Sequence, residues 1–215
     1  MKNISENPIW QWIGSLADLV LLNLCWLLCS LPVVTAGAAA QAMFRCAGKM
    51  AEGRKWRLRE DFFAAFRADL GLSVRFWLPM LVFEVLVGFD LWYGGRAGLP
   101  LLTMAAVVFA ALWCMAAVWG FALIGRFHYV RARDVLRDAL AMAAANPHVS
   151  LTAVLLTVWA PAALLLWPAF VSGILPAIVL LDGSLSALIL SALMLPGFRR
   201  IEKQRETSEN AEDNE

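Results

Sequence analysis

The chain has 215 residues, of which 61% are hydrophobic and 16% charged, and its formal net charge is +1. Soluble domains typically have about 45–50% apolar and about 25% charged residues, so this composition excludes an ordinary soluble domain and indicates a polytopic membrane protein. The net charge gives no indication of nucleic-acid binding. The fold class that we expect is therefore all-α, a polytopic transmembrane helix bundle in the lipid bilayer.

Five apolar stretches are long enough for transmembrane helices, which need about 20 mostly apolar residues. They span residues 12–34, 72–93, 99–125, 150–171 and 173–198. The third stretch contains no charged residue, whereas the second carries Glu84 and the fifth carries Asp182. We expect residues 1–200 to form a single transmembrane helical domain. Residues 201–215 lack aromatic side chains and are predicted to be a disordered cytoplasmic tail.

The first apolar stretch ends in the sequence SLPVVTAGAA, residues 30–39, which has two interpretations. Ala36-Gly37-Ala38 has the small-residue pattern of a signal-peptide cleavage site. A signal peptide, however, needs a basic region before its apolar stretch, and here the basic residues follow it. We therefore expect no cleavage. Instead, Pro32 and Gly37 let the chain bend out of the membrane, and Thr35 can hydrogen-bond the freed backbone of the turn.

Basic residues are distributed unevenly among the connections. All Lys and Arg residues except Lys2 and Arg96 lie at residues 45–75, 126–137 and 199–205. Because positive residues favour the cytoplasmic side of short loops, these three segments should be cytoplasmic. With five spans, the N-terminus then lies outside and the C-terminus inside.

Two of these cytoplasmic segments have the pattern of amphipathic helices. In the first, aromatic residues follow Asp61, which is a plausible N-cap by residue type. In the second, aliphatic residues lie opposite Arg133 and Asp134. Such helices can lie at the membrane interface or dock against the bundle. The candidate partner-docking residues on the two apolar faces are Phe62, Phe63, Phe66, Leu136 and Leu140.

Three polar residues within the stretches are candidates for function or packing. Glu84 lies near the middle of its span, where a charge is costly unless it is paired, hydrated or protonated, so it is either a proton or substrate site or a packed, hydrogen-bonded group. Asp182 is either partly buried in a continuous fifth span or part of an external turn at Gly183. Asn23 is expected to hydrogen-bond another helix.

Motifs for catalysis and metal binding give no positive indication. The sequence has no phosphate-binding loop, zinc-protease, serine-hydrolase or dinucleotide-binding motif. Its four cysteines include no CxxC pair, and His128 and His148 have no neighbouring Cys or carboxylate array. We expect no enzymatic activity, no cofactor and no bound metal.

Two blocks of sequence resemble a known family. ADLVLLNLCWLLCSLPVVTAGAAAQA (residues 17–42) has the order Asn, Trp, Leu-Pro, Thr, Gly-Ala, and DFFAAFRADL (residues 61–70) follows a basic segment. Both blocks resemble the YesL-like bacterial integral membrane proteins, a family of unknown function. The resemblance covers about residues 8–200 and departs at residues 38–40, where the family often has Thr and aromatic residues. It implies a multi-pass protein of the bacterial cytoplasmic membrane that is linked to sugar ABC transporters, and it brings no catalytic or binding residues.

Two functions fit these observations. The first is a non-enzymatic accessory or assembly component of carbohydrate uptake, which docks partners through its cytoplasmic amphipathic helices. The second is a small permease or channel, in which Glu84 and Asp182 face a cavity and the protein forms homo-oligomers. A water-filled path lined by Glu84 would favour the permease, whereas a dry bundle with exposed cytoplasmic helix faces would favour the accessory protein.

The predicted orientation can be tested with a reporter that is active only in the cytoplasm. The reporter should work when fused after Glu215 and fail when fused before Met1, because five spans place the two ends on opposite sides. Activity at both ends would mean an even number of spans and would contradict the five-span arrangement.

Overall fold

The computed structural model describes residues 8–166 and 168–212, most of which are helical. Two short segments precede longer helices: the 3-10 turn η2 (Val33–Thr35) and the π-helical segment η3 (Leu58–Phe63). No strand occurs in these described ranges, so the all-α class is confirmed for them. The α-helices are α1 (Pro8–Ser30), α2 (Ala36–Ala51), α3 (Ala64–Ala68), α4 (Leu70–Ala97), α5 (Pro100–Arg126), α6 (Ala132–Ala145), α7 (Pro147–Leu166) and α8 (Pro168–Glu212).

Helices occupy all five predicted positions, but not all of them qualify as spans by length and composition. Within the described part of the chain, three segments are long and apolar enough to cross a membrane: Leu70–Ala97, Pro100–Arg126 and Val179–Lys203. A fourth candidate is α6 together with α7, a pair bent by 105°. Near the N-terminus, Gly14–Ser30 is a shorter apolar helix. The count of five therefore stays a prediction.

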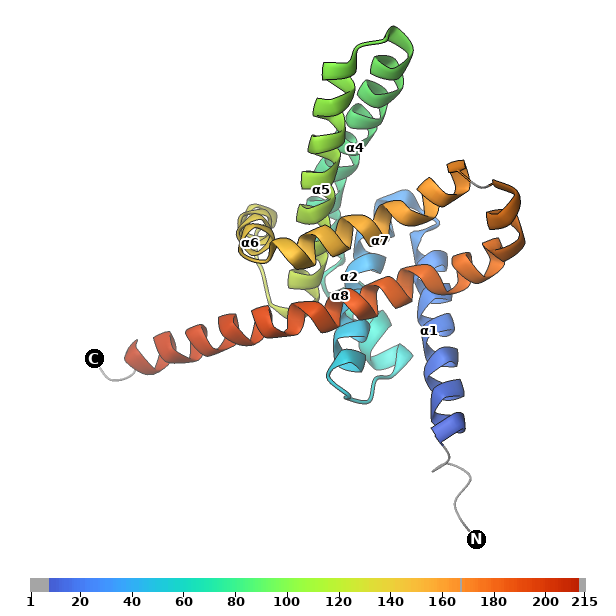
Figure 1. Cartoon of the computed structure of the whole chain (residues 1–215). Coiled ribbons are helices and arrows are strands. Elements are labelled where there is room, and N and C mark those ends of the chain that lie inside the picture. Colours follow the sequence, from blue (N-terminus) through green and yellow to red (C-terminus); the bar gives the residue numbers. More distant parts are fainter. Residues whose placement is uncertain (1–7, 167, 213–215) are drawn as a thin grey trace.

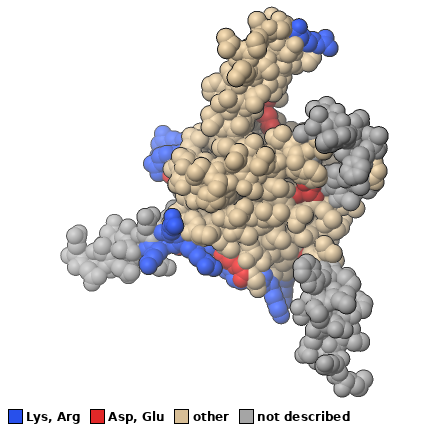
Figure 2. All heavy atoms as spheres, in the orientation of Figure 1, with Lys and Arg blue, Asp and Glu red and all other residues tan. Residues whose placement is uncertain are grey.

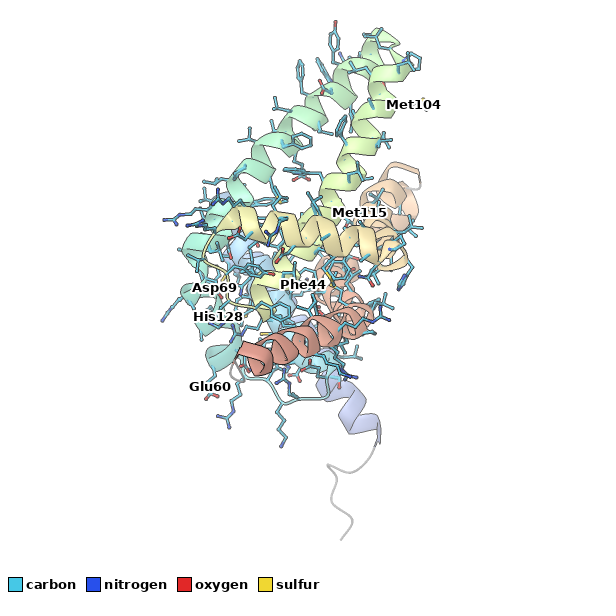
Figure 3. All side chains as sticks on the ribbon, turned by 90° about the vertical axis from the view of Figure 1, so that its left-hand side faces the viewer. Phe44, Glu60, Asp69, Met104, Met115 and His128 are labelled. Carbon is cyan, nitrogen blue, oxygen red and sulfur yellow. The ribbon has the colours of Figure 1, made fainter. Side chains whose placement is uncertain are left out.

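The helices form two hairpins around a central helix (Figure 1). Helices α4 and α5 pair and project away from the rest, while α7 and α8 form the second hairpin. The first hairpin turns at Gly98, which has the left-handed φ of 65° that glycine adopts without strain, and Pro100 then opens α5. Figure 3 shows Met104 far out on this hairpin, where it is 65% exposed, and Phe44 among the central helices.

Helix α2 lies at the centre and turns back beside α1 (Figure 1). At the turn, the Oγ1 atom of Thr35 lies 2.7 Å from the carbonyl oxygen of Cys29 and 2.8 Å from that of Pro32. Its hydroxyl can therefore satisfy a carbonyl group that the end of α1 leaves without a helical partner. Pro32 precedes η2 in an extended conformation, which separates the two helices.

The reversal at α2 changes where the first basic segment lies. The sequence predicted one span followed directly by a surface segment, whereas α2 carries the chain back toward the end at which α1 begins (Figure 1). Sequence periodicity missed α2 as a central helix because it is only 16 residues long and includes Gln41 and Arg45. Many of its core-facing residues are small, and Ala38, Ala39 and Ala42 are fully buried. The orientation of the chain stays a prediction, which the paired reporter fusions test.

Helix α8 is continuous through Asp182 and Gly183 and extends to Glu212. Of the two placements considered for Asp182, the structure has the continuous helix, and the external turn at Gly183 is wrong. Residues 201–212 are helical although the sequence predicted disorder there, because they are rich in Glu, Lys, Gln and Arg, which are strong helix formers. Residues 213–215 lie outside the described residues.

Asn23 joins the first helix to the last. Its Nδ2 atom donates to the carbonyl oxygen of Val179 (2.7 Å), and its Oδ1 atom accepts from the backbone N–H of Ser184 (3.0 Å). The side chain is only 1% exposed. A Cβ atom at Gly183 would lie 2.6 Å from Oδ1 of Asn23, so glycine leaves the space that this contact needs.

Replacing Asn23 should separate α1 from α8. We expect Asn23→Ala to lower the free energy of unfolding by about 1–2 kcal/mol, because two interhelical hydrogen bonds are lost. The measurement is unfolding by SDS in mixed detergent micelles. Asn146→Ala is the control, because the Asn146 amide donates to Met142 one turn earlier in the chain (3.1 Å). Equal losses in the two variants would contradict the interhelical role of Asn23.

A second test compares two glycines of α2. A Cβ atom at Gly37 would lie 2.5 Å from Cβ of Trp77, whereas one at Gly48 would meet nothing within 4 Å. We expect Gly37→Ala to destabilise the protein by about 1–3 kcal/mol through overpacking. Gly48→Ala should be neutral or stabilising by up to about 1 kcal/mol, because alanine favours the helix. Thermal unfolding of both variants in one detergent tests this, and a stable Gly37→Ala protein would contradict the tight contact with α4.

Candidate functional site

A polar cavity of about 570 Å³ lies where the C-terminal ends of α2 and α5 meet α8. Its lining has more cationic than anionic side chains. Figure 2 shows Lys and Arg gathered along one edge of the molecule, over the C-terminal part of α8 and the loop after α2, whereas the sides of the α4–α5 hairpin are mostly uncharged. The lining residues are Phe44, Arg45, Gly48, Lys49, Glu52, Arg54, Ala122, Gly125, Arg126 and Glu202.

The local sequence of α2 and α5 builds this cavity. Arg45 and Lys49 are four residues apart on α2, so they share one helix face. Gly125 lets α5 approach that helix closely, since a Cβ atom there would lie 3.0 Å from the Gln41 carbonyl oxygen. Lys49 and Arg126 also lie in the last turns of their helices, where a positive charge is favoured by the helix dipole.

A chain of ion pairs crosses the cavity wall. Glu52 pairs with Arg54 and, at 2.7 Å, with Nη1 of Arg126. Nε of Arg126 in turn lies 2.8 Å from Oε1 of Glu202 on α8. The guanidinium of Arg126 also lies over the Phe198 ring, 5.3 Å from its centroid. Burial acts to raise the pKa of Glu52, but the hydrogen bond from Arg126 and the nearby Arg54 outweigh it and hold that pKa below its ordinary value.

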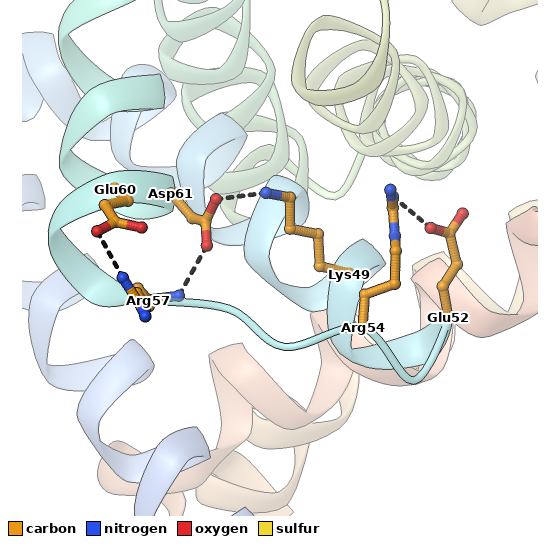
Figure 4. A network of polar contacts seen from close by, with 6 residues as sticks. All are labelled: Lys49, Glu52, Arg54, Arg57, Glu60 and Asp61. Atoms are coloured by element: carbon orange, nitrogen blue, oxygen red, sulfur yellow. Dashed lines mark hydrogen bonds and ion pairs between the residues drawn. The ribbon is translucent and has the colours of Figure 1, made fainter.

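A second set of contacts holds the chain after α2, at the start of η3 (Figure 4). Asp61 pairs with Lys49 through Oδ1 and accepts the backbone N–H of Arg57 through Oδ2 (2.7 Å). The structure corrects the predicted cap, because Arg57, not Asp61, is the N-cap of η3, and Asp61 lies in the first turn. Burial acts to raise the pKa of Asp61, but its hydrogen bonds to Lys49 and to the Arg57 backbone outweigh it and lower that pKa.

The chemistry that this cavity offers is electrostatic. No Ser, Thr, Cys or His side chain lines it, and the lining side chains of Lys49, Glu52 and Glu202 are engaged in ion pairs. The four cysteines are free thiols. Among the described residues, no group of three or more His, Cys, Asp or Glu side chains could hold a metal ion. The arrangement is suited to binding a charged group through Arg and Lys.

The two candidate carboxylates of the spans lie in different surroundings, and neither lines the cavity. Glu84 is exposed on α4 and lies near Cys114 of α5. Asp182 is half-buried on α8, where its Oδ1 atom accepts a hydrogen bond from Nε1 of Trp159 (2.9 Å). No hydrogen bond or ion pair joins Glu84 to Asp182 within the part of the chain that the structure describes.

The predicted docking residues differ in how much of each side chain is buried. Phe62 is fully buried and packs edge-to-face on Phe63, 5.3 Å away, so a docking role for Phe62 is wrong. The reason is that η3 and α3 press their aromatic face onto the core instead of leaving it open. Phe63, Phe66 and Leu136 are partly buried against the same core. Leu140 on α6 differs, because 49% of its surface is exposed.

Sequence reasoning missed the cavity itself. The sequence predicts that the basic segments face the cytoplasm and that two of them form amphipathic helices, but it does not predict that they line a common cavity. The partners Arg126 and Glu202 are 76 residues apart, so no local pattern connects them. A usable signal was the presence of Glu52 and Glu202 within basic segments, since isolated carboxylates among several cations often form pairs.

Acid should weaken the contacts of Asp61. Because its pKa is below the ordinary value of 3.8, its ionised form contributes stability above that pH, and the contribution is lost as pH falls through the lowered pKa. At pH 7 we expect Asp61→Asn to reduce the free energy of unfolding by about 1 kcal/mol. The difference from wild type should shrink toward pH 3.

Thermal unfolding between pH 7 and pH 3 measures this effect. Glu60→Gln serves as the control and should change little, since the Glu60 side chain is 65% exposed and pairs with Arg57 at the surface. A constant difference between Asp61→Asn and wild type at every pH would contradict the role of the ionised carboxylate.

Comparison with known proteins gives one match. Residues 19–91 match a family described as "Protein of unknown function, DUF624", and the matched region is less than half of the chain. It contains α2 and its turn, the segment with Asp61 and most of α4. No curated protein and no solved structure matches this chain. Residues 19–91 are therefore similar to a family of unknown function.

Proposed function

We propose that this protein is a non-enzymatic accessory or assembly component of the bacterial cytoplasmic membrane that serves carbohydrate uptake. Its partners would be components of a sugar ABC transporter. In this proposal the basic edge of the molecule faces the cytoplasm. Five spans would place the N-terminus outside and the C-terminus inside, whereas the return of α2 to the end at which α1 begins would place the N-terminus beside the basic edge (Figure 1). The paired reporter fusions decide between these two positions of the N-terminus.

The observation that carries the proposal is the exposure of two apolar side chains, one on α6 and one in the loop before it. Leu140 is 49% exposed and Val130 is 88% exposed. The opposite side of α6 is used for packing, because Val135 and Ala139 are fully buried. An amphipathic helix that packs by one face and leaves apolar side chains outward among charged neighbours can bind a partner helix or groove.

The link to carbohydrate uptake comes from the resemblance of residues 17–42 and 61–70 to YesL-like proteins. The match of residues 19–91 to a family of unknown function supports the relationship of this region to an uncharacterised family and names no partner. Co-purification therefore tests whether the partner is a component of a sugar ABC transporter.

A small permease or channel that uses Glu84 and possibly homo-oligomers is the second candidate. One observation favours it, namely that Glu84 is exposed on a spanning helix, where an isolated charge would need a partner or water. Against it, the cavity is lined by neither Glu84 nor Asp182, and Asp182 already accepts a hydrogen bond from Trp159. These observations support the accessory role more strongly.

A matched pair of variants tests docking through α6. Leu140→Glu places a charge on the exposed face of α6, and Leu101→Glu does the same at the far end of the α4–α5 hairpin, where Leu101 is 82% exposed. We expect Leu140→Glu to reduce recovery of co-purified transporter components about tenfold, because a charge is buried at the contact, and Leu101→Glu to retain them. The measurement is affinity purification of the full chain from mild detergent with mass spectrometry. Equal recovery from both variants would exclude docking through α6.

Glu84→Gln separates the two candidate functions. The substitution keeps the shape of the side chain and removes its charge, so an accessory protein should fold, insert and complement a deletion strain as well as wild type does. A permease that moves protons or polar substrates through Glu84 should lose complementation while it still folds. Glu84→Leu extends the test, because it also removes the hydrogen-bonding group. Loss of complementation by a well-folded Glu84→Gln protein would move the assignment to the permease.

A further inference from the structure

Arg45 differs from the other cations of the cavity. Lys49 pairs with Asp61, Arg54 pairs with Glu52, and Arg126 pairs with two carboxylates. Arg45 lines the same cavity and is partly buried, yet it forms no ion pair with any described residue. It acts on Asp61 only through space, where it helps to lower the pKa of that carboxylate, so Arg45 is the lining cation that no described carboxylate pairs with directly.

The balance of charge in the cavity suits an anion. The lining contains two more cationic than anionic side chains, and the nearby carboxylate of Asp61 reduces this excess by one. One positive charge then remains, which matches the single negative charge of a phosphodiester. Partly buried charges are screened less than those at the surface, so this excess is available to a ligand.

The shape of the cavity supports binding of more than a bare ion. A volume of about 570 Å³ falls within the range typical of small-molecule sites. Gly48 contributes no side chain, and a Cβ atom there would meet nothing within 4 Å, which keeps part of the wall open. Basic pockets between membrane helices are suited to lipid headgroups, and guanidinium groups bind phosphate oxygens through paired hydrogen bonds.

We propose that this cavity binds one phosphate-bearing anion, held by Arg45 together with Arg54 and Arg126. Glu202 competes with the anion for Arg126, because its Oε1 atom lies 2.8 Å from Nε of that residue. Bound phosphate takes the place of Glu202 and releases the C-terminal part of α8 from α5. The proposal goes beyond the accessory role and does not depend on it. The same phosphate chemistry is available from a lipid headgroup or from a free phosphate compound.

The test measures the melting temperature of the full chain in an uncharged detergent. One arm adds inorganic phosphate, with sodium chloride at matched ionic strength as the reference. The other adds mixed micelles that contain phosphatidylglycerol, with phosphatidylcholine as the reference. We expect stabilisation above the reference in at least one arm. Stabilisation by phosphatidylglycerol alone identifies a lipid headgroup, and stabilisation by inorganic phosphate shows that the phosphate group suffices.

Three variants connect this response to the cavity. Arg45→Gln should weaken binding about tenfold, because a charged hydrogen-bonding partner is lost. Arg133→Gln, at an exposed position of α6 outside the lining, should bind as wild type does. Glu202→Gln should bind more tightly than wild type, because it removes the competing carboxylate. This gain would not arise if the arginines served only to stabilise the helix ends.

Several results would overturn the proposal. These are a wild-type protein that neither probe stabilises above its reference, an Arg45→Gln protein that binds as well as wild type, and equal weakening by Arg45→Gln and Arg133→Gln. If Arg45→Gln does not fold, Arg54→Gln replaces it, because the Arg54 side chain is 62% exposed and lines the same cavity. An unchanged affinity in Arg54→Gln then overturns the proposal in the same way.

Discussion

The close packing of α2 against its neighbours is the constraint on which the rest of the structure depends. Gly37 leaves room for Trp77 of α4, and Gly125 brings the end of α5 against the backbone of α2 at Gln41. The buried Gln41 side chain donates to Asp69, at the junction of α3 and α4 (3.2 Å). Small residues thus permit two close approaches to α2, one by the Trp77 side chain at Gly37 and one between backbones at Gly125.

This packing also decides where the charges lie. With α2 fixed against α5, Lys49 and Glu52 are carried to the end of α5, next to Arg126, and Glu202 reaches the same place from α8. Three helices that are distant in sequence thus share one set of ion pairs. Away from Arg126, ring contacts such as Phe83 with Trp113, whose centroids are 4.3 Å apart, join α4 to α5. The ion pairs and these ring contacts therefore lie in different regions of the molecule.

The sequence predicted the helices better than their arrangement. Apolar length located α4 and α5 closely, because a long, mostly apolar stretch in a membrane satisfies its backbone hydrogen bonds as a helix. It did not predict the reversal at α2, since a short helix of alanine and glycine packs by shape rather than by hydropathy. The amide of Asn23 was recognisable as an interhelical group, but its partners Val179 and Ser184 were not, because backbone atoms carry no sequence signal. The cavity was hard to predict for a different reason, because its wall combines side chains from distant segments and only Glu52 and Glu202 among the basic residues point to it.

The contact of Asn23 with α8 has a consequence for biogenesis. Its partner Val179 follows it by 156 residues, so the amide of the first helix is made long before the backbone groups that satisfy it. At typical synthesis rates this interval is roughly 10–30 s. During that time the Asn23 side chain lacks both partners, so the polar contact between α1 and α8 forms only late in synthesis. Arrival of α8 supplies the missing donor and acceptor together, and so it completes the polar contact that α1 leaves open.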